Sequence, residues 1–221
     1  MNMSTRTRSE ITSEIEKHGI VAIIRLQDPA SLRSVVDALI EGGIRAMEVT
    51  MTVPGAIELI RQLAPTLTSD FILGAGTVLD ADTVHRAAQA GAQFIVSPVF
   101  RPEVIAAAHE DGIPAMPGCF TPTEILAAWD VGADVVKVFP ATSVGPGYLK
   151  DVRAPLPQVK LMPTGGVSID NAGDWLRAGA VAVGVGSSLV DSKAIAAGQF
   201  SVIAENARRI VANVAAARGA R

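Results

Sequence analysis

The sequence is poor in the residues on which several classes of protein depend. Cys119 is the only cysteine among 221 residues, which excludes an internal disulfide and a metal site made of clustered cysteines. There is no block of basic residues and the formal net charge is -3, so nucleic acid and anionic membranes are not expected as partners. No apolar run reaches membrane-spanning length, and the first ten residues do not resemble a signal peptide. These absences favour a protein of the reducing cytoplasm.

Aromatic residues are also scarce, at 4% of the chain, although 49% of the residues are hydrophobic. The core must therefore consist mainly of Ala, Val, Ile and Leu, which is typical of parallel sheets buried by helices on both faces. The length fits one large α/β domain. The surplus of apolar residues leaves room for a subunit interface.

Apolar runs recur at intervals of about twenty to twenty-five residues, with a helical pattern after most of them. The expected strands are residues 20–25, 45–50, 71–77, 93–97, 113–117, 134–140, 159–162 and 181–185. The expected helices are residues 28–41, 54–63, 80–91, 102–111, 121–132, 168–179 and 199–216. The clearest start signal is at Thr121, where a capping box precedes a first-turn proline.

This alternation, with no composition break, predicts an α/β fold, a single (β/α)8 TIM barrel over residues 1–221 with an N-terminal helix. Residues 1–8 are expected to form a flexible tail before that helix. An open doubly wound sheet shares the alternation and stays an alternative. The number of strands favours the barrel, and no Gly-x-Gly-x-x-Gly turn follows the first strand, as a dinucleotide-binding sheet would require.

Lys137 interrupts the apolar, β-branched run of residues 134–140. In a buried strand, desolvation lowers the pKa of a lysine, so that the free amine can attack a ketone or aldehyde and form an imine. The alternative is a lysine at a strand end whose ammonium group reaches water. This segment alone leaves both interpretations open.

Arg25, Glu48 and Lys137 are charged residues on three separate expected strands, each flanked by apolar residues. The active site of an α/β barrel lies at the C-terminal ends of its strands. Any one of the three could be a surface charge at a strand end. Isolated charges in such a place are costly, however, and opposite charges stabilise one another. We therefore expect the three side chains to meet at one mouth.

Glycine-containing turns follow the seventh and eighth expected strands, at residues 163–168 and 184–188. Glycine lets backbone N–H groups approach an anion closely, and the next helix N-terminus adds a partial positive charge. One Gly-Gly pair is most often only a tight turn. Two glycine turns at the positions where barrels commonly hold a phosphate predict a phosphate site.

Six short motifs occur in order along the chain: Glu-Val-Thr (48–50), Gly-Ala-Gly-Thr-Val (74–78), Ile-Val-Ser-Pro (95–98), Met-Pro-Gly (116–118), Lys-Val-Phe-Pro (137–140) and Pro-Thr-Gly-Gly-Val (163–167). With them the chain resembles, from Gly19 to Val190, the 2-keto-3-deoxy-6-phosphogluconate (KDPG) aldolases, class I enzymes that also act on 4-hydroxy-2-oxoglutarate. The resemblance implies cleavage of KDPG to pyruvate and glyceraldehyde 3-phosphate through a lysine Schiff base. It also implies a homotrimer that uses no metal or other cofactor.

The resemblance assigns roles to individual residues. Lys137 would be the Schiff-base lysine and Glu48 the acid/base. The implied substrate-pocket residues are Thr77, Pro98, Phe139 and Thr164, and the implied phosphate site consists of Gly165, Gly166, Gly186 and Ser187. Many members bind the substrate carboxylate with an arginine four residues after the glutamate, where this chain has Thr52. We expect Arg25 to bind the carboxylate instead.

Other functions remain open from the residues alone. The nearest is the same reaction on the galactonate-derived epimer, 2-keto-3-deoxy-6-phosphogalactonate. A phosphosugar isomerase or a non-catalytic phosphosugar-binding barrel would use the phosphate site without an imine. The three histidines are expected on helix surfaces, and Cys119 is expected to be a small buried filler.

Overall fold

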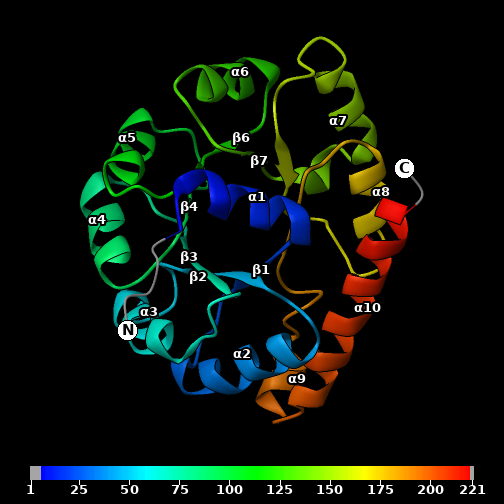
Figure 1. Ribbon diagram of the computed structural model, residues 1–221. Helices are drawn as coiled ribbons and strands as arrows, with labels where there is room; N and C mark the ends of the chain where they lie inside the picture. The colour runs from blue at the N-terminus through cyan, green and yellow to red at the C-terminus, as the bar shows by residue number, and fades with distance from the viewer. Residues whose placement is uncertain (1–5, 220–221) are drawn as a thin grey trace.

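Helices and parallel strands alternate along residues 6–219, the part of the chain that the computed structural model describes (Figure 1). The strands are β1 (Ile20–Ile24), β2 (Ala46–Thr50), β3 (Ile72–Gly76), β4 (Ile95–Val96), β5 (Ala115–Met116), β6 (Gly118–Cys119), β7 (Val136–Val138), β8 (Leu161–Pro163) and β9 (Val183–Val185). The α-helices are α1 (Arg8–His18), α2 (Leu32–Glu41), α3 (Ala56–Leu63), α4 (Ala81–Gln89), α5 (Pro102–Glu110), α6 (Pro122–Asp130), α7 (Pro146–Arg153), α8 (Ala172–Arg177), α9 (Ser192–Ala196) and α10 (Phe200–Gly219). None of these helices is long and apolar enough to cross a membrane.

Every expected strand overlaps an observed one, and β6 is an additional strand that was not expected. Pro117, which has no N–H to donate, ends the expected fifth strand and separates β5 from β6. Helices α7 and α9 were not expected. Helix α7 does have a start signal, since Gly145 is its N-cap and Pro146 occupies its first position.

The strands form two parallel sheets in the described part of the chain. The larger has six strands in the order β5-β4-β3-β2-β1-β9, and the smaller has three in the order β6-β7-β8. Helices surround the strands on the outside, and α1 lies across the centre of the ring (Figure 1). The expectation of one closed eight-stranded barrel is therefore met only as an α/β fold with a curled parallel sheet and a second, smaller sheet beside it.

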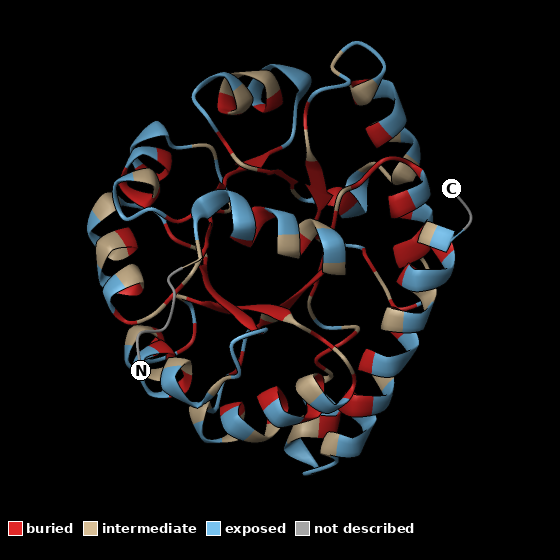
Figure 2. Cartoon of the chain, viewed as in Figure 1, coloured by how far each residue is buried: buried red, intermediate tan, exposed pale blue. Residues whose placement is uncertain are grey.

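Two apolar clusters lie on opposite sides of the strands because successive strand residues point to opposite faces. The larger cluster packs between the strands and the outer helices, and includes Ala22, Ile24 and Val49. The smaller cluster lies inside the curled sheet: Val21, Ala46, Ile72, Phe94, Val96, Met116, Val135, Met162 and Ala182, together with Ile11 and Ile15 of α1. Figure 2 shows that the strands are almost entirely buried, whereas the helices are buried only along their inner sides. Helix α1 thus closes the interior from the side where the strands begin.

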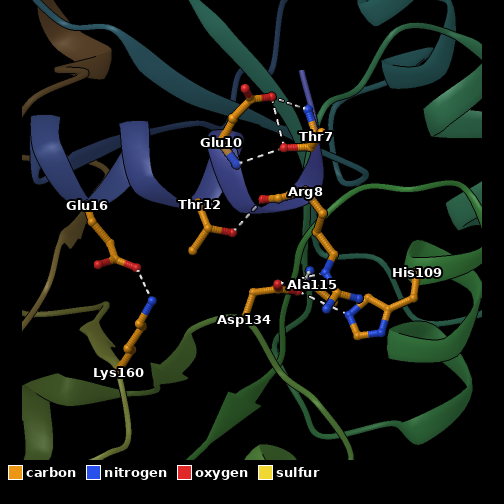
Figure 3. Close-up of polar contacts among 9 residues, drawn as sticks. All are labelled: Thr7, Arg8, Glu10, Thr12, Glu16, His109, Ala115, Asp134 and Lys160. Atoms are coloured by element: carbon orange, nitrogen blue, oxygen red, sulfur yellow. Dashed lines mark hydrogen bonds and ion pairs between the residues drawn. The ribbon is translucent and has the colours of Figure 1, made fainter. Parts of the chain in front are cut away.

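Polar contacts hold α1 against the strand starts (Figure 3). Asp134, which precedes β7, pairs with Arg8 Nε at 3.1 Å and His109 Nε2 at 3.1 Å, and accepts a hydrogen bond from the Ala115 N–H at 3.0 Å. Its side chain is 10% exposed. The expectation of a surface position is therefore only partly met for His109 on α5, which is half-buried and contacts Asp134 just before β7.

The N-terminal boundary also needs a correction. Helix α1 begins at Arg8, and a capping box between Thr7 and Glu10 fixes its start. Residues 7 and 8 of the expected tail therefore belong to the helix and its cap. Residues 1–5 of that tail lie outside the described part of the chain.

We expect Asp134→Ala to lower the free energy of unfolding by about 2–3 kcal/mol, because it leaves a backbone donor and two cationic or polar side chains without their acceptor in a mostly buried position. Urea unfolding followed by circular dichroism measures the change. The control is Asp174→Ala, whose ion pair with Arg177 is more than half exposed on both sides and should contribute within about 0.5 kcal/mol. Equal losses in the two variants would contradict the anchoring role of Asp134.

Candidate active site

The candidate site residues continue the inward-facing rows of the interior cluster toward the C-terminal ends of the strands. Each lies two residues beyond a cluster residue on its own strand or strand end: Glu48 after Ala46, Pro98 after Val96, Lys137 after Val135 and Thr164 after Met162. Arg25 lies four residues after Val21, just past the end of β1. The period of two that builds the core therefore also directs the first four of these side chains toward the same interior, on the side away from α1. Arg25 is exposed where β1 ends.

Glu48 and Lys137 are both buried, at 1% and 6% exposure. Burial raises the pKa of Glu48, while the charges of Lys137 and Arg25 partly counteract it. Burial lowers the pKa of Lys137, which Glu48 opposes and Arg25 reinforces. The three charges are thus close enough to act on one another. Lys137 is not a strand-end lysine reaching into water, and its amine is more readily neutral than that of an exposed lysine.

Thr164 brings an unpaired hydroxyl into this interior. The residue is 4% exposed, and its Oγ1 has no hydrogen-bond partner in the described structure. Its backbone is held on both sides, since its N–H donates to Val138 O at 2.9 Å and its carbonyl accepts from Ala141 N at 2.9 Å. Buried hydroxyls are normally paired, so this oxygen is available to a bound molecule.

The other expected pocket residues lie at the same ends of the strands. Phe139 follows β7, and its ring centre is 5.0 Å from Lys137 Nζ. Thr77 follows β3 with a left-handed φ of 60°, the only such non-glycine residue in the described chain. Thr77 and Pro98 are both half-buried. A left-handed backbone conformation is strained for a β-branched residue such as threonine. The surrounding structure must therefore hold the backbone in this conformation at the end of β3.

The two glycine turns lie side by side. Thr164 and Gly184 form a parallel bridge, and Ser188 Oγ donates to Val167 O at 3.2 Å. Gly165 and Gly166 have φ values of 86° and 73°, which only glycine adopts freely. Gly186 is half-buried and Ser187 is exposed. The four residues expected to bind phosphate therefore come from two adjoining turns.

One supporting expectation about this region is wrong. The helix after the first glycine turn begins at Ala172 rather than near residue 168 and has six residues. Ser168 and Asn171 instead close the turn, since Ser168 N donates to Asn171 Oδ1 at 2.8 Å and Asn171 Nδ2 donates to Gly166 O at 3.0 Å. An anion here would be bound mainly by the backbone of the turns, with little help from a helix dipole.

Thr50 is a buried polar residue of the site that the sequence analysis missed. It is fully buried, shares a strand face with Glu48, and its Oγ1 lies 2.7 Å from Oγ1 of the exposed Thr52. A period of two counted from Glu48 would have found it. A pair of hydroxyl groups therefore occupies this position at the end of β2.

Cys119 is confirmed as a buried residue. Burial, with a smaller contribution from Glu124, raises the pKa of its thiol to about 12, and the thiol donates to Glu124 O at 3.4 Å. It stays protonated and is no nucleophile at neutral pH. Within residues 6–219, no three His, Cys, Asp or Glu side chains gather as a metal site would require.

Comparisons with known proteins place this geometry in a family. The model of the family KDPG and KHG aldolase matches residues 11–206. The chain is 37% identical to 2-dehydro-3-deoxy-phosphogluconate aldolase of Treponema pallidum (strain Nichols), over 87% of this chain and 92% of the relative. It is 40% identical to a probable 2-dehydro-3-deoxy-6-phosphogalactonate aldolase of Rhizobium meliloti (strain 1021), over 77% of this chain and 81% of the relative.

A solved structure agrees with the sequence relatives. KDPG aldolase from Legionella pneumophila, with pyruvate captured at low pH as a covalent carbinolamine intermediate, matches with a TM-score of 0.83 and 31% identity, over 90% of this chain and 97% of that chain. The family model spans residues 11–206, which include the buried lysine and glutamate. The chain belongs to the KDPG and KHG aldolase family.

Proposed function

We propose that this protein is a class I aldolase that cleaves KDPG to pyruvate and glyceraldehyde 3-phosphate and also acts on 4-hydroxy-2-oxoglutarate. The observation that carries the proposal is the buried Lys137 amine, with its lowered pKa, near the buried Glu48 carboxylate. Such an amine can form an imine, which neither a phosphosugar isomerase nor a non-catalytic binding barrel needs. Family membership supplies the substrate class.

In the proposed reaction, neutral Lys137 Nζ attacks the C2 ketone of the substrate, and loss of water from the carbinolamine leaves a protonated imine. Glu48 takes the proton of the C4 hydroxyl, the C3–C4 bond breaks, and its electron pair moves into the imine to give an enamine. The aldehyde leaves, C3 is protonated, and hydrolysis of the imine releases pyruvate and the free amine. Glu48 can exchange these protons because burial raises its pKa toward the working range.

We further propose which groups hold the two ends of the substrate. Arg25 binds the carboxylate with its planar guanidinium and so fixes the ketone against the amine. The adjoining turns that contain Gly165, Gly166, Gly186 and Ser187 bind the distal phosphate through backbone N–H groups. Between them lie the pocket residues Thr77, Pro98, Phe139 and Thr164. The unpaired Thr164 hydroxyl supports a hydrogen bond to a substrate oxygen.

We propose that the two sheets belong to one closed (β/α)8 barrel in a single domain. Three backbone contacts between the sheet edges support this: Asp134 N donates to Ala115 O at 3.1 Å, Val181 N donates to Leu161 O at 3.0 Å, and Thr164 pairs with Gly184. Since β5 and β6 are separated only by Pro117, they are two pieces of one strand. The observed strands then correspond to the eight of a barrel.

A second substrate deserves a direct comparison because the chain is 40% identical to a probable 2-dehydro-3-deoxy-6-phosphogalactonate aldolase. The epimers differ at one stereocentre, and the proposed chemistry is the same for both. The ratio of kcat/KM for the two epimers decides between them, and a ratio that favours the galactonate compound would overturn the primary assignment.

We propose that the protein is located in the cytoplasm, which fractionation of cells would test.

We propose that the protein is a homotrimer. The described chain exposes apolar side chains just after three of its strands, Leu79 after β3 at 44%, Val99 after β4 at 45% and Phe120 after β6 at 37% exposure. Large apolar side chains exposed at the same ends of the strands are candidates for burial in a subunit interface. Val99→Glu should dissociate the trimer, as measured by size exclusion with light scattering. Val131→Glu, at a residue 48% exposed beyond α6, is the control, and a monomeric parent protein would refute the proposal.

Trapping with borohydride tests the Schiff base. Reduction in the presence of pyruvate should leave a stable mass adduct on Lys137, located by peptide mass spectrometry, because borohydride reduces the imine to an amine. Lys137→Ala should abolish the adduct, whereas Lys150→Ala, at an exposed position on α7, should keep it in full. An undiminished adduct in the Lys137 variant would refute the assignment.

The pH dependence of trapping should move in opposite directions in two variants. Glu48 raises the pKa of Lys137 and Arg25 lowers it, and imine formation needs the neutral amine. At saturating pyruvate, the midpoint of the trapping rate should therefore fall in Glu48→Gln and rise in Arg25→Met. The exposed Arg101, paired with Glu103 at 2.9 Å, supplies the control variant Arg101→Met, which should not shift. Shifts of the same sign would contradict the proposed arrangement of charges.

A further inference from the structure

Both inward-facing residues in the second half of β3 are glycines, and each is covered by a side chain from a neighbouring strand. A Cβ added at Gly74 would lie 2.4 Å from the ring of Phe94. A Cβ added at Gly76 would lie 2.4 Å from Glu48 Oε1 and 2.6 Å from its Cδ. These separations are far below van der Waals contact. The Glu48 carboxylate therefore lies directly against the bare backbone of Gly76.

The strand register explains this contact. Glu48 pairs with Gly74, and Thr50 pairs with Gly76. The Glu48 side chain starts beside Gly74 and extends toward the C-terminal end of the sheet, where it crosses the backbone two residues further along β3. Any side chain at position 76 would point from the same face into the space that the carboxylate occupies.

Position 76 requires glycine because there is no room for a side chain, and not because of its backbone conformation. Gly76 lies within a regular strand and is not among the glycines with a positive φ. An alanine could adopt its backbone conformation without strain. The consequence of an added methyl group at this position would therefore come from its contact with the carboxylate.

We propose that Gly76 is a positioning residue for the reaction: its lack of a side chain sets where the Glu48 carboxylate lies relative to the Lys137 amine. The inference rests on the acid–base role proposed above for Glu48. Gly76 would then have a function beyond packing. Gly74 does not share it, because a core aromatic ring covers Gly74.

The first measurement is the turnover of Gly76→Ala. The added methyl displaces the carboxylate, and a misplacement of about 1 Å can cost about a hundredfold in rate, so kcat should fall by about tenfold to a hundredfold. Arg25 and the glycine turns are untouched, so KM should change much less. Gly74→Ala is the matched control, since it presses on Phe94 instead; its melting temperature should fall while its kcat stays within about twofold to threefold.

A double-mutant cycle with Glu48→Ala separates positioning from general damage. Glu48→Ala removes the three atoms that the new methyl would press on, Oε1, Cδ and Cγ. In that background, adding Gly76→Ala should leave the residual kcat unchanged, and the melting temperature lost in the single variant should return. If the single variant does not fold, recovery of folding in the double variant carries the same information.

The outcomes distinguish this inference from the proposed function. If Gly76→Ala lowers kcat by the same factor with and without the Glu48 carboxylate, or if the double variant stays as unstable as the single one, the positioning role is wrong while the aldolase assignment stands. A normal kcat in Gly76→Ala would also overturn it. If Lys137→Ala still traps pyruvate, the proposed function itself fails, whatever the Gly76 variants show.

Discussion

The structure depends on placing two opposite charges inside an apolar enclosure. Water would stabilise an ammonium or a carboxylate far better than the interior does, so burial pushes Lys137 and Glu48 toward their neutral forms. Their mutual attraction opposes this and favours the charged form of each group. Neither group alone would have this balance, because an isolated buried charge simply neutralises. The pair is thus held ready for chemistry that requires an uncharged amine first and a proton acceptor next.

Glycines help to enclose this pair. Gly76 on β3 lies against the Glu48 carboxylate, and a Cβ at Gly184 on β9 would lie 2.3 Å from Thr164 Oγ1. Larger inward residues, such as Phe94 and Met162, belong to the apolar cluster near α1. Large side chains therefore fill the interior on the side of α1, whereas these two glycines leave room for polar side chains nearer the C-terminal ends of the strands.

The alternation of strands and helices, and the unusual placement of Lys137 and Glu48 within apolar strands, could be predicted because each leaves a local signal in the sequence. Strand and helix alternation is a periodic signal, and a charge within an apolar run, as at Lys137, stands out without any tertiary information. The break at Pro117 and the short helix α9 left weaker marks, since proline is tolerated at strand ends and five residues are too few for a helical pattern. The role proposed for Gly76 could not be predicted from neighbouring residues in the sequence, because it arises from contact with Glu48 on another strand. His109 was partly misjudged for the same reason, since its partner Asp134 lies 25 residues further along the chain.

Helix α1 has a consequence for access to the interior. Ile11 and Ile15 fill the space where the strands begin, together with the other apolar side chains of the smaller cluster. Glu48 and Lys137 lie beyond that packed layer, toward the C-terminal ends of their strands. A small molecule that reaches the pair must therefore approach from the C-terminal side, while packed side chains exclude water on the side of α1.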